Sequence, residues 1–195
     1  MKRCGRSDMR CLLVLLLWLV TLGTAQAQDD QDRIRRFIDE TQVILSQGGP
    51  QTNLRLQGLY REILDIDGLA ARVAPATIWD RADPAARSRF AALLLCRLAR
   101  ETERQGDRGY QSLTFLGNRT DGAVRIVALR LILEDGGQRT VIFELTGPPE
   151  QGRILDFRSE DGRLSVRMAE QILRDATPVN DQTAPAAWID SLLCR

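Results

Sequence analysis

The chain has 195 residues, a formal net charge of +1 and no histidine. Without histidine, His-dependent catalytic triads are excluded and any metal site lacks its commonest ligand. A nearly neutral chain also lacks the basic field that nucleic-acid binding usually requires, so we expect no nucleic-acid partner. We find no glycine-rich phosphate-binding loop and expect no cofactor.

Residues 1–27 have the pattern of a secretory signal peptide. A basic start is followed by the uncharged run 11–23, and Ala25 and Ala27 then supply the small residues that a signal peptidase reads. The run is shorter than the ~20 apolar residues of a membrane-spanning helix. We therefore expect cleavage near Ala27 and export to the periplasm.

Two cysteines follow the signal segment, Cys96 and Cys194. They are too few for a structural zinc site. An oxidising compartment would allow them to form a disulfide. The alternative is that Cys96 is a small buried hydrophobe within the apolar segment 91–98, while Cys194 lies on a loose tail. Both alternatives stay open.

Apolar residues at helical spacing predict helices on both sides of a central group of strands. The first helix covers 29–47, and short helices follow within 58–73. A longer helix is expected from the N-cap Asp83 to about Gln105. The last main helix is expected after Gly162.

The segment between these helices predicts four strands joined by short, glycine-rich turns. They cover residues 110–117, 123–134, 139–146 and 152–159. Connections this short favour antiparallel neighbours. The expected fold class is therefore α+β, a four-stranded antiparallel meander with amphipathic helices packed against it. We expect one domain at 28–175, followed by a flexible linker and a short amphipathic segment at 176–195.

The strand at 123–134 is apolar on both faces. Alternate residues of a strand point to opposite sides, so Val127 and Leu129 share one face while Ile126 and Ala128 share the other. A strand with one wet face would alternate apolar and polar residues. We therefore expect both faces of this strand to be covered.

Two pairs of acidic residues are candidates for chemistry. Glu144 and Asp156 fall on neighbouring expected strands, where two carboxylates could support acid–base catalysis or simply form cross-strand ion pairs with nearby arginines. Asp65 and Asp67 are not followed by the oxygen donors of a calcium loop. For this second pair the spacing favours a helix N-cap.

Three segments resemble a known family. Residues 64–79 contain aspartates and apolar residues leading to a tryptophan, and 82–90 is similar to the helix start A-[ST]-P-E-Q-R-x-x-F. Residues 152–165 resemble the signature G-W-K-I-x-D-V-x-x-[ED]-G-x-S, with Arg153 in place of the usual aromatic residue. On these segments the chain resembles the MlaC or toluene-tolerance family of periplasmic phospholipid-binding proteins. A hopanoid-biosynthesis-associated branch of the same superfamily is the alternative.

The resemblance implies a lipid carrier and not an enzyme. Such a carrier holds the tails of a phospholipid, or of a hopanoid-type lipid, in an internal apolar pocket. Its partners would be an inner-membrane ABC transporter complex and an outer-membrane lipoprotein complex of the Mla type, which maintain the lipid asymmetry of the outer membrane. Two alternatives stay open: a periplasmic enzyme acting on a lipid or isoprenoid, and a ligand-free adaptor between envelope proteins.

The candidate pocket residues are apolar side chains on the expected inward faces of helices and strands. They are Leu69, Val73, Trp79, Phe90, Leu94, Leu98, Val127, Leu129 and Phe143. Arg125 and Arg130 are candidates for the headgroup side. In the enzyme alternative, Asp156 or Glu144 would be the first acid–base candidates.

Overall fold

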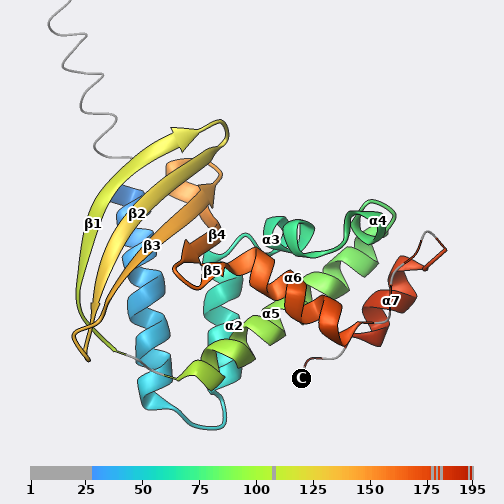
Figure 1. The fold of residues 1–195 in the computed structure, drawn as a ribbon, viewed down its shortest axis with the longest axis horizontal. Coiled ribbons are helices and arrows are strands. Elements are labelled where there is room, and N and C mark those ends of the chain that lie inside the picture. The colour runs from blue at the N-terminus through green and yellow to red at the C-terminus, as the bar shows by residue number, and fades with distance from the viewer. Residues whose placement is uncertain are drawn as a thin grey trace, which may run out of the picture.

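The computed structural model describes residues 28–106, 109–176, 178, 180, 182–192 and 194. The fold class is α+β, as expected: helices precede and follow one antiparallel sheet (Figure 1). The expected signal segment, residues 1–27, lies outside the described residues. Within the described part of the chain, no helix is both long and apolar enough to cross a membrane.

Two of the helices begin at the aspartate N-caps that the sequence indicates. Residues 28–47 are helical and are called the N-terminal helix. The others are α2 (Thr52–Ile63), α3 (Ile66–Val73), α4 (Ala76–Trp79), α5 (Pro84–Gln105), α6 (Leu164–Asp175) and α7 (Pro185–Ser191). The Asp65 carboxylate accepts a hydrogen bond from the Gly68 amide, 3.0 Å away, and Asp83 does the same for Ala86 at 2.7 Å. The expected N-caps are therefore confirmed.

The sheet is the expected meander with one additional strand. Its strands are β1 (Tyr110–Asp121), β2 (Val124–Leu133), β3 (Gln138–Thr146), β4 (Arg153–Ser159) and β5 (Gly162–Arg163), in the order β1-β2-β3-β4-β5. All neighbours are antiparallel. The sheet thus has five strands rather than four, because the two-residue strand β5 folds back on β4 before α6 begins.

The two faces of β2 are covered unequally. Val127 and Leu129 are buried, while Ile126 and Ala128 on the opposite face are only half-buried. The expectation of full cover is therefore confirmed for one face and wrong for the other. On the face that carries Ile126, α3 and α6 reach the sheet through Glu144 and Asp156 of β3 and β4 rather than over β2.

One aromatic cluster joins the sheet to the helices. Phe37 of the N-terminal helix has its ring centroid 5.7 Å from Tyr60 on α2 and 6.2 Å from Phe143 on β3. Phe143 in turn lies 5.5 Å from Phe157 on β4. These rings form the centre of the core between the sheet and the first two helices.

A second aromatic cluster holds the C-terminal segment. Phe90 on α5 lies between Trp79 and Trp188, at centroid distances of 6.3 and 6.0 Å. The structure also joins Cys96 on α5 to Cys194 in a disulfide, with Cα atoms 6.0 Å apart. The contact between Phe90 and Trp188 packs the short helix α7 against α5. The disulfide links α5 covalently to Cys194, which follows α7 in the chain.

Candidate functional site

The sheet presents one apolar face to the N-terminal helix, which lies inside the curve of the strands (Figure 1). Because alternate residues share a face, β2 places Arg125, Val127 and Leu129 in one row. Across the register, Phe143 pairs with Val127 and Leu145 with Arg125. We call this surface the inner face of the sheet.

The N-terminal helix covers the inner face with a single stripe of side chains. Asp30, Ile34, Phe37 and Ile44 recur at intervals of four, three and seven residues, which places them on one side of a helix. All four are at most 9% exposed. The stripe is apolar except at Asp30 and at Thr41, which lies between Phe37 and Ile44.

Asp30 and Arg125 form a buried ion pair between the helix and the sheet. The Arg125 guanidinium donates from Nε to Asp30 Oδ2 over 2.7 Å and from Nη2 to Oδ1 over 2.9 Å. Nη1 donates to the Gly147 carbonyl. A Cβ atom at Gly152 would collide with this guanidinium, so the lack of a side chain there leaves room for the ion pair. The two parallel hydrogen bonds between the Arg125 guanidinium and the Asp30 carboxylate are the strongest geometry for such an ion pair.

The structure places the remaining candidate residues in several groups. Val127, Leu129 and Phe143 share the inner face with Arg125. Arg130 lies on the opposite row of β2 and is exposed, so it does not join Arg125. The other candidates belong to the helical core. They are Leu69 and Val73 on α3, Trp79 on α4, and Phe90, Leu94 and Leu98 on α5.

Sequence reasoning missed the side chains that face this surface from the N-terminal helix. The helical period of Ile34 and Phe37 predicted a core-facing stripe, but not what it faces. The burial of Asp30 had no signal in the sequence, because its partner Arg125 is 95 residues away.

Two cavities open on the surface away from the candidate residues. One, of about 810 Å³, is lined mainly by charged side chains of α5 and the end of α6, including Arg97, Arg100 and Asp175. The other, of about 380 Å³, lies between the start of the N-terminal helix and the end of α2. None of the candidate residues lines either cavity, and Val127, Leu129 and Phe143 of the inner face are buried in the core.

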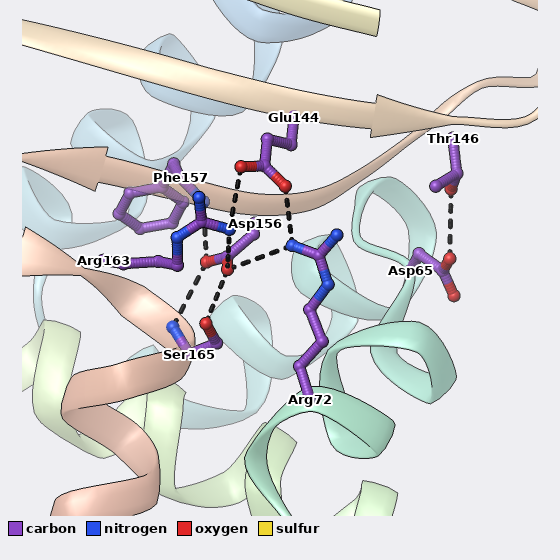
Figure 2. A network of polar contacts seen from close by, with 8 residues as sticks. All are labelled: Asp65, Arg72, Glu144, Thr146, Asp156, Phe157, Arg163 and Ser165. Atoms are coloured by element: carbon purple, nitrogen blue, oxygen red, sulfur yellow. Dashed lines mark hydrogen bonds and ion pairs between the residues drawn. The ribbon is translucent and has the colours of Figure 1, made fainter. Parts of the chain in front are cut away.

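The carboxylates of Glu144 and Asp156 meet two arginines (Figure 2). Arg72 Nη1 lies 2.6 Å from Glu144 and 3.3 Å from Asp156, and Arg163 Nη1 lies 2.8 and 3.7 Å from the same two groups. The Ser165 hydroxyl donates to Asp156 over 2.6 Å. The network therefore connects the sheet to α3 and α6.

Asp156 has its acceptor positions filled. Its side chain is 0% exposed, and its Oδ1 accepts from the amides of Phe157 and Ser165. The Ser165 amide lies in the first turn of α6, so Asp156 caps that helix from outside. Arginines were expected near this pair, and the two that form ion pairs with it are Arg72 and Arg163 rather than Arg125, Arg130 or Arg158. A saturated, buried carboxylate has no oxygen left to exchange a proton with a substrate.

The described residues contain no group of three or more Cys, Asp or Glu side chains placed to hold a metal ion.

Comparison with known proteins relates the chain to others through its fold. No family model and no curated protein sequence matches it. A solved structure does: a phospholipid-binding protein from Ralstonia solanacearum in complex with a phospholipid, at 1.53 Å resolution. The TM-score is 0.60 at 15% identity, and the match covers 74% of this chain and 86% of that one. The two proteins share a fold.

Proposed function

We propose that this protein is a periplasmic lipid carrier of the MlaC type. It binds a phospholipid, or a hopanoid-type lipid, with the acyl tails inside the protein. It shuttles this lipid between an outer-membrane lipoprotein complex and an inner-membrane ABC transporter complex. The observation that carries the proposal is the fold shared with the phospholipid-binding protein of Ralstonia solanacearum. The resemblance of residues 152–165 to the MlaC signature supports it independently.

The energetics of lipid transfer explain why this kind of interior suits a carrier. Each methylene removed from water is worth ~0.8 kcal/mol, so a lipid with two tails crosses water only inside an apolar cover. The inner face provides Val127, Leu129 and Phe143, and the N-terminal helix adds Ile34 and Phe37. We assign the tails to the space between these two surfaces.

The enzyme alternative receives less support. Its first candidate, Asp156, is buried and saturated by donors, and Glu144 is held by Arg72 and Arg163. These contacts suit a structural link between the sheet and the helices. A carrier requires an apolar interior and a site for the headgroup, and neither needs an acid–base group.

Lipid analysis of the protein purified without detergent tests the proposal. Native mass spectrometry should show the chain with an additional mass of phospholipid size, and solvent extraction should recover that lipid. Delipidated protein should also take up phosphatidylglycerol from vesicles and deliver it to acceptor vesicles. Bare protein in the first experiment together with no uptake in the second would overturn the carrier and favour the adaptor.

The periplasmic location is tested separately. Cell fractionation should place the mature chain in the periplasm, and N-terminal sequencing should begin at Gln28. An intact chain of 195 residues in the cytoplasmic fraction would contradict export.

A further inference from the structure

On the N-terminal helix, the stripe of side chains that faces the sheet begins with an anionic residue and continues mainly with apolar ones. Asp30 is 3% exposed, and its stripe continues with the buried residues Ile34, Phe37 and Ile44, with the polar Thr41 between the last two. Asp30 and Ile44 are 14 residues apart, or ~21 Å along a helix axis. The hydrocarbon of one membrane leaflet is ~15 Å deep. The stripe is therefore longer than the hydrocarbon depth of one leaflet, so it can cover the part of the sheet along which an acyl chain would lie.

The inner face of β2 has the complementary order of side chains: a cationic residue comes first and apolar residues follow. Arg125 begins the row, and Val127 and Leu129 continue it. The helix and the strand run in the same direction. Asp30 meets Arg125 at one end, and Asp39 accepts from Tyr110, which pairs with Leu133 at the other end of β2.

We infer that the N-terminal helix occupies the place of the lipid, and that the phosphate of a bound phospholipid replaces the Asp30 carboxylate at Arg125. The inference rests on the proposed carrier function and adds to it a phosphate site and the element that fills the site in the empty protein. Phosphate and carboxylate are the two anions that match the fork of an arginine side chain.

The burial of Arg125 makes the exchange selective. Withdrawal of Asp30 alone would leave a buried cation without a partner, which is strongly unfavourable. A lipid with a phosphate restores the pair as the helix moves away, whereas a neutral lipid with the same tails does not. The site therefore favours phosphate-bearing lipids over diacylglycerol, and the apolar interior is never left open to water.

The chain next to the helix is suited to such a movement. The N-terminal helix ends at Gly48 and Gly49, which have φ angles of 57° and 100°. Both lie in the left-handed region that glycine adopts without strain. A change of backbone angles at these two residues can change the direction of the helix axis and leave the rest of the fold in place.

The test compares two fluorescent lipids with identical acyl chains, phosphatidylglycerol and diacylglycerol. Asp30→Asn removes the competing carboxylate, so its affinity for phosphatidylglycerol should rise about tenfold. Arg125→Gln removes the cation, so the same affinity should fall about tenfold. Diacylglycerol has no phosphate to replace Asp30 at Arg125, so its binding breaks the ion pair without restoring it. Its affinity should therefore rise in both variants, and the preference for phosphatidylglycerol over diacylglycerol should fall only in Arg125→Gln.

Asp39→Asn is the matched control. It loosens the same helix at Tyr110 without touching Arg125, so it should change the binding of both lipids by the same factor. If Arg125→Gln changes the affinity for both lipids by the same factor, the ion pair is only structural and the inference is wrong, while the carrier proposal stands. If the unaltered protein binds neither lipid, the proposed function itself fails.

A measurement on the unaltered protein covers the case in which Arg125→Gln does not fold. Loading with phosphatidylglycerol should speed amide hydrogen exchange in residues 28–47, because the helix leaves its place on the sheet. Slower or unchanged exchange in this segment, with lipid bound, would overturn the inference.

Discussion

Arg125 and Asp30 lie 95 residues apart in the chain and form a two-point ion pair with distances of 2.7 and 2.9 Å. Both residues are at most 7% exposed. The pair joins the first helix of the described chain to the inner face of the sheet. It is therefore a structural link between the helix and the sheet and, in the proposed carrier, the point at which a headgroup would bind.

The first prediction concerns the stability of this link. Asp30→Ala leaves the Arg125 guanidinium buried without its partner, and such a loss typically costs about 3–5 kcal/mol. Urea unfolding should show a decrease of this size in the free energy of unfolding. The exposed neighbour Asp29 is the control, and Asp29→Ala should change the same quantity by less than about 0.5 kcal/mol.

The second prediction places bulk on the inner face. Val127→Trp or Leu129→Trp fills the space assigned to the tails, so the lipid recovered from the purified protein should fall sharply. Both residues are at most 1% exposed, and overpacking should also cost about 1–3 kcal/mol of stability. Ile126→Trp on the half-buried opposite face should leave lipid recovery unchanged. Normal loading of both inner-face variants would place the lipid elsewhere.

The third prediction separates structure from catalysis in the network of Figure 2. Asp156→Asn removes a buried charge from between Arg72 and Arg163 and should lower the free energy of unfolding by about 3–5 kcal/mol. Ser165→Ala removes one neutral donor and should cost about 1 kcal/mol.

The same network also tests the enzyme alternative. Lipid bound per folded molecule should not change in Asp156→Asn or in Glu144→Gln, and neither should the cellular phenotype. Loss of a lipid-modifying activity in either variant would instead favour the enzyme.

The fourth prediction is an alkaline loss of stability. Burial raises the pKa of Tyr60 to about 12 from 10.0, partly offset by its hydrogen bond to Thr102. Below pH 10 the folded and unfolded states are both protonated, so Tyr60 causes no pH dependence. Between pH 10 and about 12 only the unfolded state loses the proton, and stability falls as the pH rises.

Tyr60→Phe provides the control for this alkaline effect. It keeps the ring against Phe37 and removes the titrating group, so the decrease between pH 10 and 12 should become shallower. Urea unfolding at pH 9, 10.5 and 11.5 measures the difference. Lysine does not obscure this range, because Lys2 is the only one and lies in the expected signal segment.

The fifth prediction concerns the disulfide between Cys96 and Cys194. It spans 98 residues, and a closed loop of that length should stabilise the fold by about 4–5 kcal/mol in the chain-entropy model. Reduction should lower the free energy of unfolding. It should also shift the fluorescence emission of Trp188 to longer wavelength, because α7 becomes less tightly packed and the indole more exposed to water. Mass analysis after thiol alkylation should find neither cysteine alkylated before reduction and both alkylated after it. Alkylation of either one without reductant would contradict the link.

Local chemistry determined most of the secondary structure. Asp65 and Asp83 predicted helix starts because an N-cap needs only an acceptor and the next few amides. The short turns predicted an antiparallel meander for the same reason, since a turn constrains only its adjoining strands. β5 escaped prediction because two residues, Gly162 and Arg163, carry no periodic pattern.

Tertiary structure alone decided which charged groups meet. The sequence by itself showed a carboxylate pair at Glu144 and Asp156 and an arginine at position 125, but not their partners. Arg72 and Asp30 reach them from helices remote in the chain, and Arg163 reaches them from the short strand β5, so no local period encodes the contacts. Nor could the apolar residues of β2 reveal that one face is half open, because burial depends on where the helices lie. Periodicity determined the apolar surfaces of this protein, and long-range packing decided what each surface faces.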